Sequence, residues 1–348
     1  MIAEKITLLT PLDLKRRPAS LLSRIVKLAQ VSGAAEFELM IGHADRGSVY
    51  DTRLKNAMQR HSHVRIVTQE RVGALTNLAL LRNIAAQAAG AGVLIFLDAD
   101  IEPDVKLFRS LADQVHKGVP LAMAPCLYLS KRGTQALAQG TGLETIIQSA
   151  LEYSPLNVTH WALPSSVMAV QHSDLVAAGG FFEGYSGHGY EDFDFMIRLA
   201  LAKHLIKPSP SLLVDRTYRA PLLAEGFRAE LGVLCLANLL QGNVAVHLFH
   251  GRDNEDVYYV QRNANAKLFR QRTAMLLELP PIDSPSRSLP TMITAFYEEC
   301  RRQSIDPARF HALFDARPRH LLYPRSIGEK VLRGAKRAFR RWTGPAMQ

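Results

Sequence analysis

Val93-Leu94-Ile95-Phe96-Leu97-Asp98-Ala99-Asp100 is the stretch of sequence that decides the fold. The unbroken apolar run over residues 93–97 predicts a central strand whose two faces are both covered. The chain before it alternates between expected strands at residues 6–9, 37–41 and 64–67 and expected helices at residues 20–30 and 75–89. This alternation predicts an α/β fold with a parallel, doubly wound sheet, whose ligands bind where the strands end.

The chain after residue 105 follows a less regular pattern. Strands are expected at residues 121–127, 166–170 and 244–249, and helices at residues 191–202 and 222–240. Polar residues interrupt the most apolar long stretch, residues 232–249, which therefore predicts a buried helix followed by a strand and not a membrane span. A proline-rich linker is expected at residues 280–285.

The composition is that of a folded protein, since 47% of its 348 residues are hydrophobic and 21% are charged. Intrinsic disorder, collagen-like repeats and disulfide-rich miniproteins are excluded. The three cysteines, Cys126, Cys235 and Cys300, are too scattered for a zinc knuckle and predict reduced thiols in a cytosolic protein. The apolar stretch near residue 1 is too short for a signal peptide, so we expect none.

The net charge of +10 is concentrated at the end of the chain. Residues 301–348 hold 12 Lys or Arg against 3 Asp or Glu, whereas the first 300 residues are nearly balanced. Apolar residues recur every three or four positions over residues 326–344, with basic residues between them, which predicts a basic amphipathic helix. An anionic membrane surface and the folded body are both possible partners for it. No nucleic-acid-binding motif accompanies the charge, so we expect no nucleic acid partner.

Asp98 and Asp100 follow the apolar strand at positions i and i+2, so their carboxylates are expected to point the same way and share one divalent cation. Oxygen ligands of this kind suit Mg²⁺ or Mn²⁺, which also take phosphate oxygens. Two solvated acids in a turn are the alternative interpretation. A phosphatase of the haloacid dehalogenase type is disfavoured, because that motif sits on the first strand and has Thr or Val where this chain has Glu102.

A glycine-rich segment, residues 179–189, leads into Glu191 and Asp192 at the start of an expected helix. Acidic residues in a first helical turn are favoured by the helix dipole, by about 0.3–1 kcal/mol each. A carboxylate behind a glycine-rich loop is also where a general base would be placed, and the pattern leaves both interpretations open. Asp194 and Arg198 are expected to form an ion pair within the helix.

His247 and His250 lie on or next to the expected strand at residues 244–249. Residues three apart on a strand face opposite sides, so the two histidines are not expected to share one metal ion. His250, at the strand end before Gly251, is the better candidate ligand, and His247 is expected to be a packed histidine or one that supports a metal ligand without binding the ion.

These motifs stand in the order found in GT-A glycosyltransferases, and the chain resembles glycosyltransferase family 2 over roughly residues 4–265. The residues that carry the resemblance are Thr10-Pro11, Asp45, Arg82-Asn83, Asp98-Ala99-Asp100, the glycine-rich segment with Glu191-Asp192, and His250. Within this family, the motifs are most similar to those of bacterial capsular polysaccharide enzymes of the chondroitin polymerase type. The Glu-Asp segment is also similar to that of the β-1,4-galactosyltransferases.

The resemblance implies a role for each matching residue on the donor side. Thr10, Pro11 and Asp45 would line the uridine site, and Arg82 would approach the nucleotide. The metal ion, Mn²⁺ or Mg²⁺, would be bound by Asp100 and His250, with Asp98 touching the ribose or the metal. The chain departs from the family pattern after its second strand, where residues 41–45 lack the usual acidic pair followed by Gly-Ser.

On the acceptor side the resemblance implies that Asp192 is the catalytic base and Glu191 an acceptor contact. The family often has Trp where this chain has His188, which alters a wall of the acceptor site. We expect a GT-A catalytic domain over residues 1–270, with a nucleotide-binding half (1–105) and an acceptor-binding half (106–270). Residues 271–348 are expected to form a helical extension with the basic tail.

The predicted function is metal-dependent, inverting transfer of a hexosyl or N-acetylhexosaminyl group from a UDP-sugar to a saccharide acceptor, in capsule or other surface polysaccharide synthesis. A nucleotidyltransferase would need a glycine-rich loop after the first strand, and residues 10–17 contain no glycine. A non-catalytic subunit of a polysaccharide assembly complex remains the alternative of another class. The expected location is the cytoplasm, with contact to the inner face of the cell membrane through residues 326–344.

Overall fold

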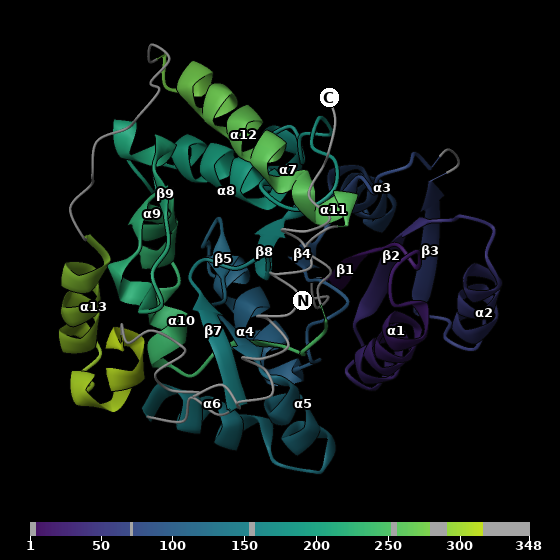
Figure 1. Cartoon of the computed structure of the whole chain (residues 1–348), viewed down its shortest axis with the longest axis horizontal. Helices are drawn as coiled ribbons and strands as arrows, with labels where there is room; N and C mark the ends of the chain where they lie inside the picture. Colours follow the sequence, from purple (N-terminus) through teal and green to yellow (C-terminus); the bar gives the residue numbers. More distant parts are fainter. Residues whose placement is uncertain (1–4, 70–71, 153–156, 252–255, 279–290, 316–348) are drawn as a thin grey trace, which may run out of the picture. The chain divides into compact units, whose positions relative to one another are not determined.

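The computed structural model describes residues 5–69, 72–152, 157–251, 256–278 and 291–315 (Figure 1). Residues 1–314 form one compact unit. The predicted linker at 280–285 and the predicted basic helix at 326–344 both lie outside the described residues. Among the described residues, no helix combines the length and the apolar character that crossing a bilayer requires.

A six-stranded sheet forms the centre, in the order β3-β2-β1-β4-β8-β5. Its strands are β1 (Ile6–Leu12), β2 (Glu38–Ala44), β3 (Val64–Gln69), β4 (Val93–Phe96), β5 (Ala122–Met123) and β8 (Met168–Gln171). The first four strands of that order are parallel, as predicted, and β8 runs antiparallel to both of its neighbours. All four residues of β4 are buried, because this strand lies inside the sheet and is covered on both faces.

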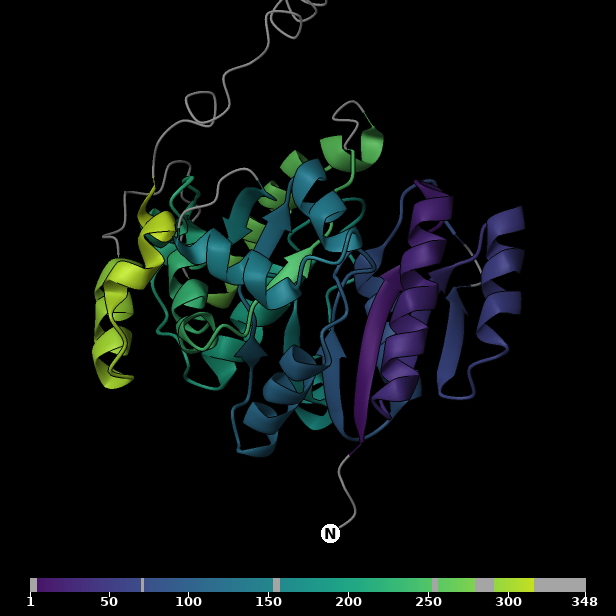
Figure 2. The same cartoon turned by 90° about the horizontal axis from the view of Figure 1, so that it is seen from below.

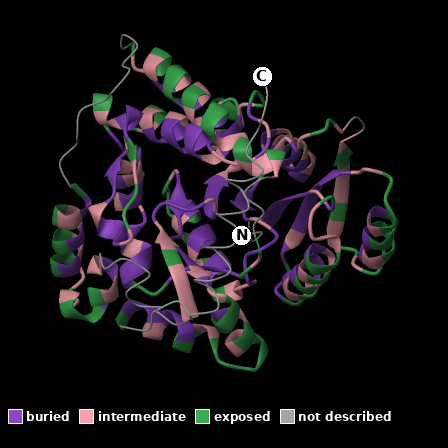
Figure 3. Cartoon of the chain, viewed as in Figure 1, coloured by how far each residue is buried: buried purple, intermediate pink, exposed green. Residues whose placement is uncertain are grey.

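Helices cover both faces of this sheet (Figures 1 and 2). One face carries α1 (Pro18–Ala34), α2 (Val49–Met58) and α4 (Val105–His116), and the other carries α3 (Leu78–Ala89), α7 (His172–Ala177) and α8 (Glu191–Ala202). The buried residues of α4 recur every three or four positions, which places one helical stripe on the sheet. Figure 3 shows buried residues concentrated where the helices meet the strands.

A second, three-stranded sheet has the order β11-β6-β7. Its strands are β6 (Cys126–Leu129), β7 (Val158–Ala162) and β11 (Ala245–His247). Around a third apolar cluster, which includes residues of this sheet, lie α6 (Leu143–Glu152), α9 (Phe227–Val233), α10 (Leu236–Leu240), α13 (Thr291–Arg302) and η4 (Pro307–Phe314). The remaining elements are α5 (Lys131–Ala138), η2 (Pro210–Leu213), β9 (Asp215–Arg216), η3 (Pro221–Leu223), β10 (Glu225–Gly226), α11 (Val257–Val260) and α12 (Arg262–Leu276).

Two predictions about the second half were wrong in detail. The expected helix at 222–240 is divided into η3, β10, α9 and α10. Gly226 has a φ of +74°, and a Cβ there would come within 2.0 Å of the Val214 carbonyl oxygen, so the backbone cannot continue as a helix. The expected strand at 121–127 is two strands, β5 and β6, separated at Pro125, which has no N–H for a sheet hydrogen bond.

Candidate active site

One cavity of about 990 Å³ opens where β1 and β4 end. It is lined by seven of the nine predicted site residues, which are Pro11, Arg82, Asp98, Asp100, Glu191, Asp192 and His250. The parallel strands bring Pro11, Asp98 and Asp100 to one edge of the sheet. Arg82 comes from α3, and Glu191 and Asp192 come from the start of α8. The two acidic motifs, ninety positions apart in sequence, therefore face the same space.

Thr10 and Asp45 are outside this lining. Thr10 is fully buried within β1, and its hydroxyl oxygen has no hydrogen-bond partner among the described residues. Asp45 follows β2 and bonds instead to Lys55, at 2.5 Å, and to the backbone N–H of Gly47. The structure does not bring either residue to the cavity with the others.

Arg82 is buried between Glu191 and Asp98. Its Nη1 donates to Glu191 Oε1 at 2.7 Å, and its Nη2 donates to Asp98 Oδ1 at 2.9 Å. Ser166, which precedes β8, donates its hydroxyl to the other oxygen of Asp98 at 3.0 Å. Asp98 is therefore held by Arg82 and Ser166.

Glu191 and Asp192 begin α8 in a setting that disfavours their charge. Tyr190, just before them, has a φ of 80°, a left-handed conformation that turns the chain sharply into the helix. Burial raises the pKa of both carboxyls above their ordinary values; the charge of Asp192 adds to this at Glu191, and Arg82 opposes it at both. A carboxyl with a raised pKa that faces a cavity is the usual setting of a general base.

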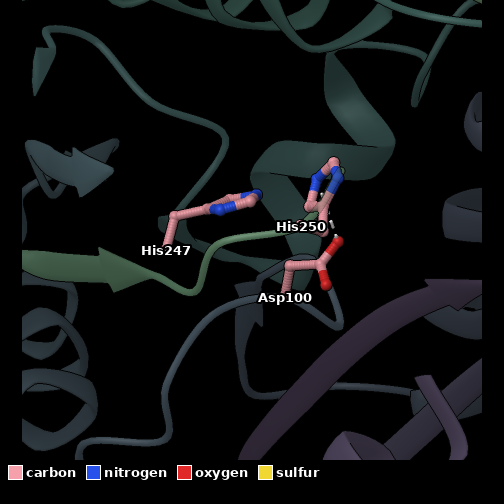
Figure 4. A group of neighbouring side chains, drawn as sticks. All are labelled: Asp100, His247 and His250. Carbon is pink, nitrogen blue, oxygen red and sulfur yellow. Dashed lines mark ion pairs between the residues drawn. The ribbon is translucent and has the colours of Figure 1, made fainter. Parts of the chain in front are cut away.

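Asp100, His247 and His250 form a group of possible metal ligands (Figure 4). One ligand atom from each lies within 4.8 Å of the other two. Backbone hydrogen bonds create the group: the N–H of Leu248 donates to the Asp100 carbonyl oxygen at 2.8 Å, and that of Glu102 to Val246. These bonds fix the segment after β4 against the end of β11.

The expectation that His247 and His250 would face apart was wrong. β11 ends at His247, so the alternation of side chains along a strand does not extend to His250, and the two rings lie 5.3 Å apart. Asp98 is not among these possible metal ligands, although it was expected to share a cation with Asp100. Strand β4 ends at Phe96, so the alternation of side chains along a strand does not extend to Asp98 and Asp100. One carboxylate oxygen and two imidazole nitrogens are a donor set that fits a divalent transition metal ion.

Two arginines that were not predicted from the sequence as site residues bind Asp100. Arg17, directly before α1, donates from Nη1 and Nη2 to the two carboxylate oxygens at 3.1 and 2.9 Å. Arg24 of α1 contacts the same carboxylate and also donates to the Phe249 carbonyl oxygen at 3.0 Å. Although burial opposes it, the Arg17 guanidinium lowers the pKa of Asp100 to about 2.

A further set of cavity residues that was not predicted from the sequence comes from α11 and α12. Tyr258, Tyr259 and Arg262 line the cavity, and the guanidinium carbon of Arg16 lies 3.7 Å from the centre of the Tyr258 ring. Asn265 of α12 donates its side-chain amide to the carbonyl oxygens of Ser186, His188 and Gly189, at 3.0 to 3.3 Å. The basic run at residues 15–17 was the one available signal for Arg16 and Arg17.

A mostly parallel sheet with an acidic, histidine-bearing cavity at its strand ends defines the GT-A class of fold. The sequence model of the family described as glycosyltransferase-like family 2 matches residues 8–273, and the chain belongs to this family. The resemblance drawn from the motifs is therefore confirmed at the level of the family and the fold. No curated protein matches the chain.

Several solved structures are similar to the chain at low identity. Glucosyl-3-phosphoglycerate synthase from Mycobacterium tuberculosis, solved with Mn²⁺, UDP and glucosyl-3-phosphoglycerate, is 12% identical, with 82% of this chain and 87% of that chain covered and a TM-score of 0.39. Residues 1–349 of S. aureus TarS are 11% identical, with coverage of 81% and 98% and a TM-score of 0.39. The catalytic domain of Drosophila β1,4-galactosyltransferase 7 with xylobiose is 15% identical, with coverage of 56% and 60% and a TM-score of 0.29.

Proposed function

We propose that the protein is a metal-dependent, inverting glycosyltransferase that moves a sugar from a UDP-sugar to a saccharide acceptor. The observation that carries the proposal is that Asp192 and the group of Asp100 with two histidines line one cavity. This arrangement provides a base for an acceptor hydroxyl and, in the same space, ligands for a cation beside the donor diphosphate. Residues 1–105 would form the nucleotide-binding half, residues 106–270 the acceptor half and residues 271–348 the extension.

Asp100, His250 and His247 would hold the metal ion. Two imidazole ligands beside one carboxylate favour Mn²⁺ over Mg²⁺, which prefers an all-oxygen shell. When bound, such an ion supplies positive charge that stabilises the departing diphosphate. Arg17 and Arg24 lie at the same carboxylate and add positive charge beside the proposed metal site, so we assign the diphosphate to this end of the cavity.

Asp192 would act as the general base. Its carboxylate takes the proton of the acceptor hydroxyl while that oxygen attacks the anomeric carbon, and the bond from this carbon to UDP breaks on the opposite face. The product has inverted configuration, and general-base help of this kind contributes about 10²–10⁴-fold to the rate. Arg82 orients the neighbouring Glu191 and Asp98, so that Glu191 can contact the acceptor and Asp98 the ribose.

Replacement of the base tests this assignment. Asp192→Asn should abolish transfer while calorimetry still detects UDP-sugar binding with Mn²⁺, because the amide keeps the shape but cannot accept the proton. Asp113→Asn, on the exposed side of α4, is the matched control and should keep wild-type activity. Equal loss of binding and turnover in Asp192→Asn would remove Asp192 from the role of base.

The donor and the metal are tested by a thermal-shift panel. UDP-, GDP-, ADP- and CMP-sugars are each added with and without Mn²⁺, and we expect a shift with a UDP-sugar only when Mn²⁺ is present. Asp100→Asn should lose that shift. A shift with UDP-sugar that does not change on addition of EDTA would contradict the metal requirement.

For the basic tail we propose contact with an anionic membrane, which suits an enzyme of surface polysaccharide synthesis. Each cation near such a surface contributes about 1 kcal/mol. The full chain should float with vesicles rich in phosphatidylglycerol, whereas a chain ending at residue 320 should not. Since residues 1–314 form a compact unit, the shorter chain retains the folded body. Equal flotation of both chains would contradict membrane contact through the tail.

A further inference from the structure

The arginines of the cavity differ in how they are neutralised. The cavity is lined by Arg16, Arg17, Arg82, Arg219, Arg228 and Arg262. Arg17 is paired with Asp100, Arg82 with Asp98 and Glu191, and Arg228 with Asp215. Arg16 is 3.9 Å from Asp256.

Arg219 and Arg262 differ from these four, because neither has a carboxylate within ion-pair distance in the described part of the chain. Both are half-buried. A guanidinium that is partly removed from water without a counter-ion costs free energy, which a bound anion would offset. Two such cations in the lining of one cavity therefore indicate a ligand charge that the ion pairs of the described residues do not supply.

Arg262 lies against the end of the glycine-rich segment. Its guanidinium carbon lies 4.8 Å from the centre of the Tyr190 ring. Gly189 has a φ of +89°, and a Cβ at this position would come within 2.4 Å of Arg262 Nη1. Glycine suits this position because of its positive φ and because of the close approach of the Arg262 guanidinium, which lies beside Tyr190 and lines the cavity.

Arg262 lies on the side of the proposed base. Burial raises the pKa of Asp192, and Arg82 and then Arg262 counteract this rise. At Asp215, burial is opposed chiefly by Arg228, and Arg262 again acts in the same direction, so the pKa of Asp215 is below its ordinary value. The guanidinium lies beside Gly189 and Tyr190, the two residues directly before Glu191 and Asp192. Arg219 follows Asp215 by four residues, after β9.

We propose that Arg219 and Arg262 bind an anionic group of the acceptor, a carboxylate or a phosphate, next to the hydroxyl that Asp192 deprotonates. The acceptor is then an acidic or phosphorylated saccharide. This inference rests on the proposed function, because it takes the Asp192 side of the cavity as the acceptor side. Neutral hydroxyl groups of a sugar can be bound by uncharged side chains. The planar guanidinium instead matches a carboxylate or a phosphate, to which it donates two parallel hydrogen bonds.

Calorimetry on the full chain with saturating UDP and Mn²⁺ tests the inference, since UDP then occupies the diphosphate end. The probes are glucose, glucuronate, glucose 6-phosphate and inorganic phosphate. We expect at least one of the three anions to bind at least tenfold more tightly than glucose. Glucuronate and glucose 6-phosphate distinguish a carboxylate from a phosphate as the recognised group.

Arg219→Gln and Arg262→Gln should each weaken binding of that anion at least tenfold. Lys267→Gln, an exposed residue of the same helix α12, should not. Arg262→Lys keeps the charge without the paired hydrogen bonds and should retain part of the affinity, which separates recognition from misfolding. Unchanged affinity in both glutamine variants, or no anion binding above that of glucose, overturns the inference. Failure of UDP binding in the same titrations would instead overturn the proposed function.

Discussion

Arg82 Nη1 lies 2.7 Å from Glu191 Oε1, which joins α3 to the first residue of α8 through a fully buried ion pair. The pair couples the nucleotide half of the chain to the proposed base, because the same guanidinium also holds Asp98 at 2.9 Å. The carboxylates of Asp98 and Glu191, from distant parts of the sequence, are thus bound by one arginine side chain. The second oxygen of Glu191 is buried and has no hydrogen-bond partner among the described residues.

The charge of Arg82 should determine the acid limb of the pH–rate profile. Asp192 must be ionised to act as a base, and its pKa is raised by burial and lowered by Arg82. Removing that charge in Arg82→Gln raises the pKa of Asp192 further, so a larger fraction is protonated at neutral pH. The acid limb of kcat/KM should therefore move to higher pH, with activity recovering as the pH rises.

Two variants serve as controls for that profile. Arg82→Lys keeps the positive charge and should leave the limb near its wild-type position. Asp98→Asn removes a negative charge that raises the pKa of Asp192, so it should move the limb to lower pH. An acid limb that is unaffected by Arg82→Gln would mean that a group other than Asp192 titrates in the profile.

Arg17 should compete with the metal ion for Asp100. A cation bound to this carboxylate has to displace one or both oxygens from the paired guanidinium groups of Arg17 and Arg24. A hydrogen bond between charged groups contributes about 1.5–3 kcal/mol, and each 1.4 kcal/mol is about a tenfold change in affinity. Arg17→Gln should therefore bind Mn²⁺ about tenfold or more tightly, as measured by calorimetry without nucleotide.

Lys15→Gln provides the comparison, because Lys15 is a nearby cation that donates to the Ala74 carbonyl oxygen and not to Asp100. Its Mn²⁺ affinity should be close to that of the wild type. If Arg17→Gln binds Mn²⁺ more weakly, then Arg17 supports the shape of the site and does not compete with the ion.

The parallel half of the fold could be predicted because it depends on local patterns. The apolar run before Asp98 and the periodic pattern of the segments before it identify β1 to β4, α1 and α3 to within a few residues, whereas α2 was not predicted. Helix α8 begins at Glu191, as predicted, because an acidic first turn follows a glycine-rich loop. The ion pair of Asp194 and Arg198, with Nε to Oδ2 at 2.8 Å, is confirmed for the same reason.

The composition of the site could not be predicted in full, since it depends on how distant segments meet. The closeness of His247 and His250 to Asp100 follows from the end of β11 and from backbone bonds to residues 100 and 102, which no spacing in the sequence reveals. Arg17 and Arg24 reach Asp100 across the sheet edge from α1. The family motif at Asp45 was expected at the uridine site, but that residue lies outside the cavity lining.

Asn265 should act as a positioning residue for Asp192. Its buried amide holds three carbonyl oxygens of the loop that ends two residues before Glu191. Without these bonds the start of α8 can shift, and a misplacement of about 1 Å can reduce a rate about 10²-fold. Asn265→Ala should reduce kcat by roughly 10–100-fold with little change in the KM for the donor.

The exposed Asn263, on the same helix, is the matched control for this measurement, and Asn263→Ala should keep the wild-type kcat. Thermal unfolding of both variants shows whether the chain remains folded. An increase in the donor KM with an unchanged kcat would assign Asn265 to nucleotide binding and not to the position of the base.

Asp13 should make the stability of the fold sensitive to acid. It accepts two hydrogen bonds from Arg46, at 2.9 and 2.8 Å, and one from the hydroxyl of Thr76, which ties together the loops after β1, β2 and β3. Despite burial, the Arg46 guanidinium holds the pKa of Asp13 below its ordinary value in the folded state. The stabilisation is therefore present above the unfolded pKa of about 3.9 and is lost as the pH falls through the lower folded value.

Asp13→Asn should lower the free energy of unfolding by about 1.5–3 kcal/mol at pH 7, where the charged hydrogen bonds are complete. In urea unfolding at pH 3 the difference from the wild type should be smaller, because below the unfolded pKa the unfolded wild-type chain is stabilised by taking up a proton at Asp13. Asp45→Asn removes a carboxylate whose partner, Lys55, is exposed, and its effect at pH 7 should be much smaller. A loss in Asp13→Asn that is equal at both pH values would assign the effect to packing and not to the charge of Asp13.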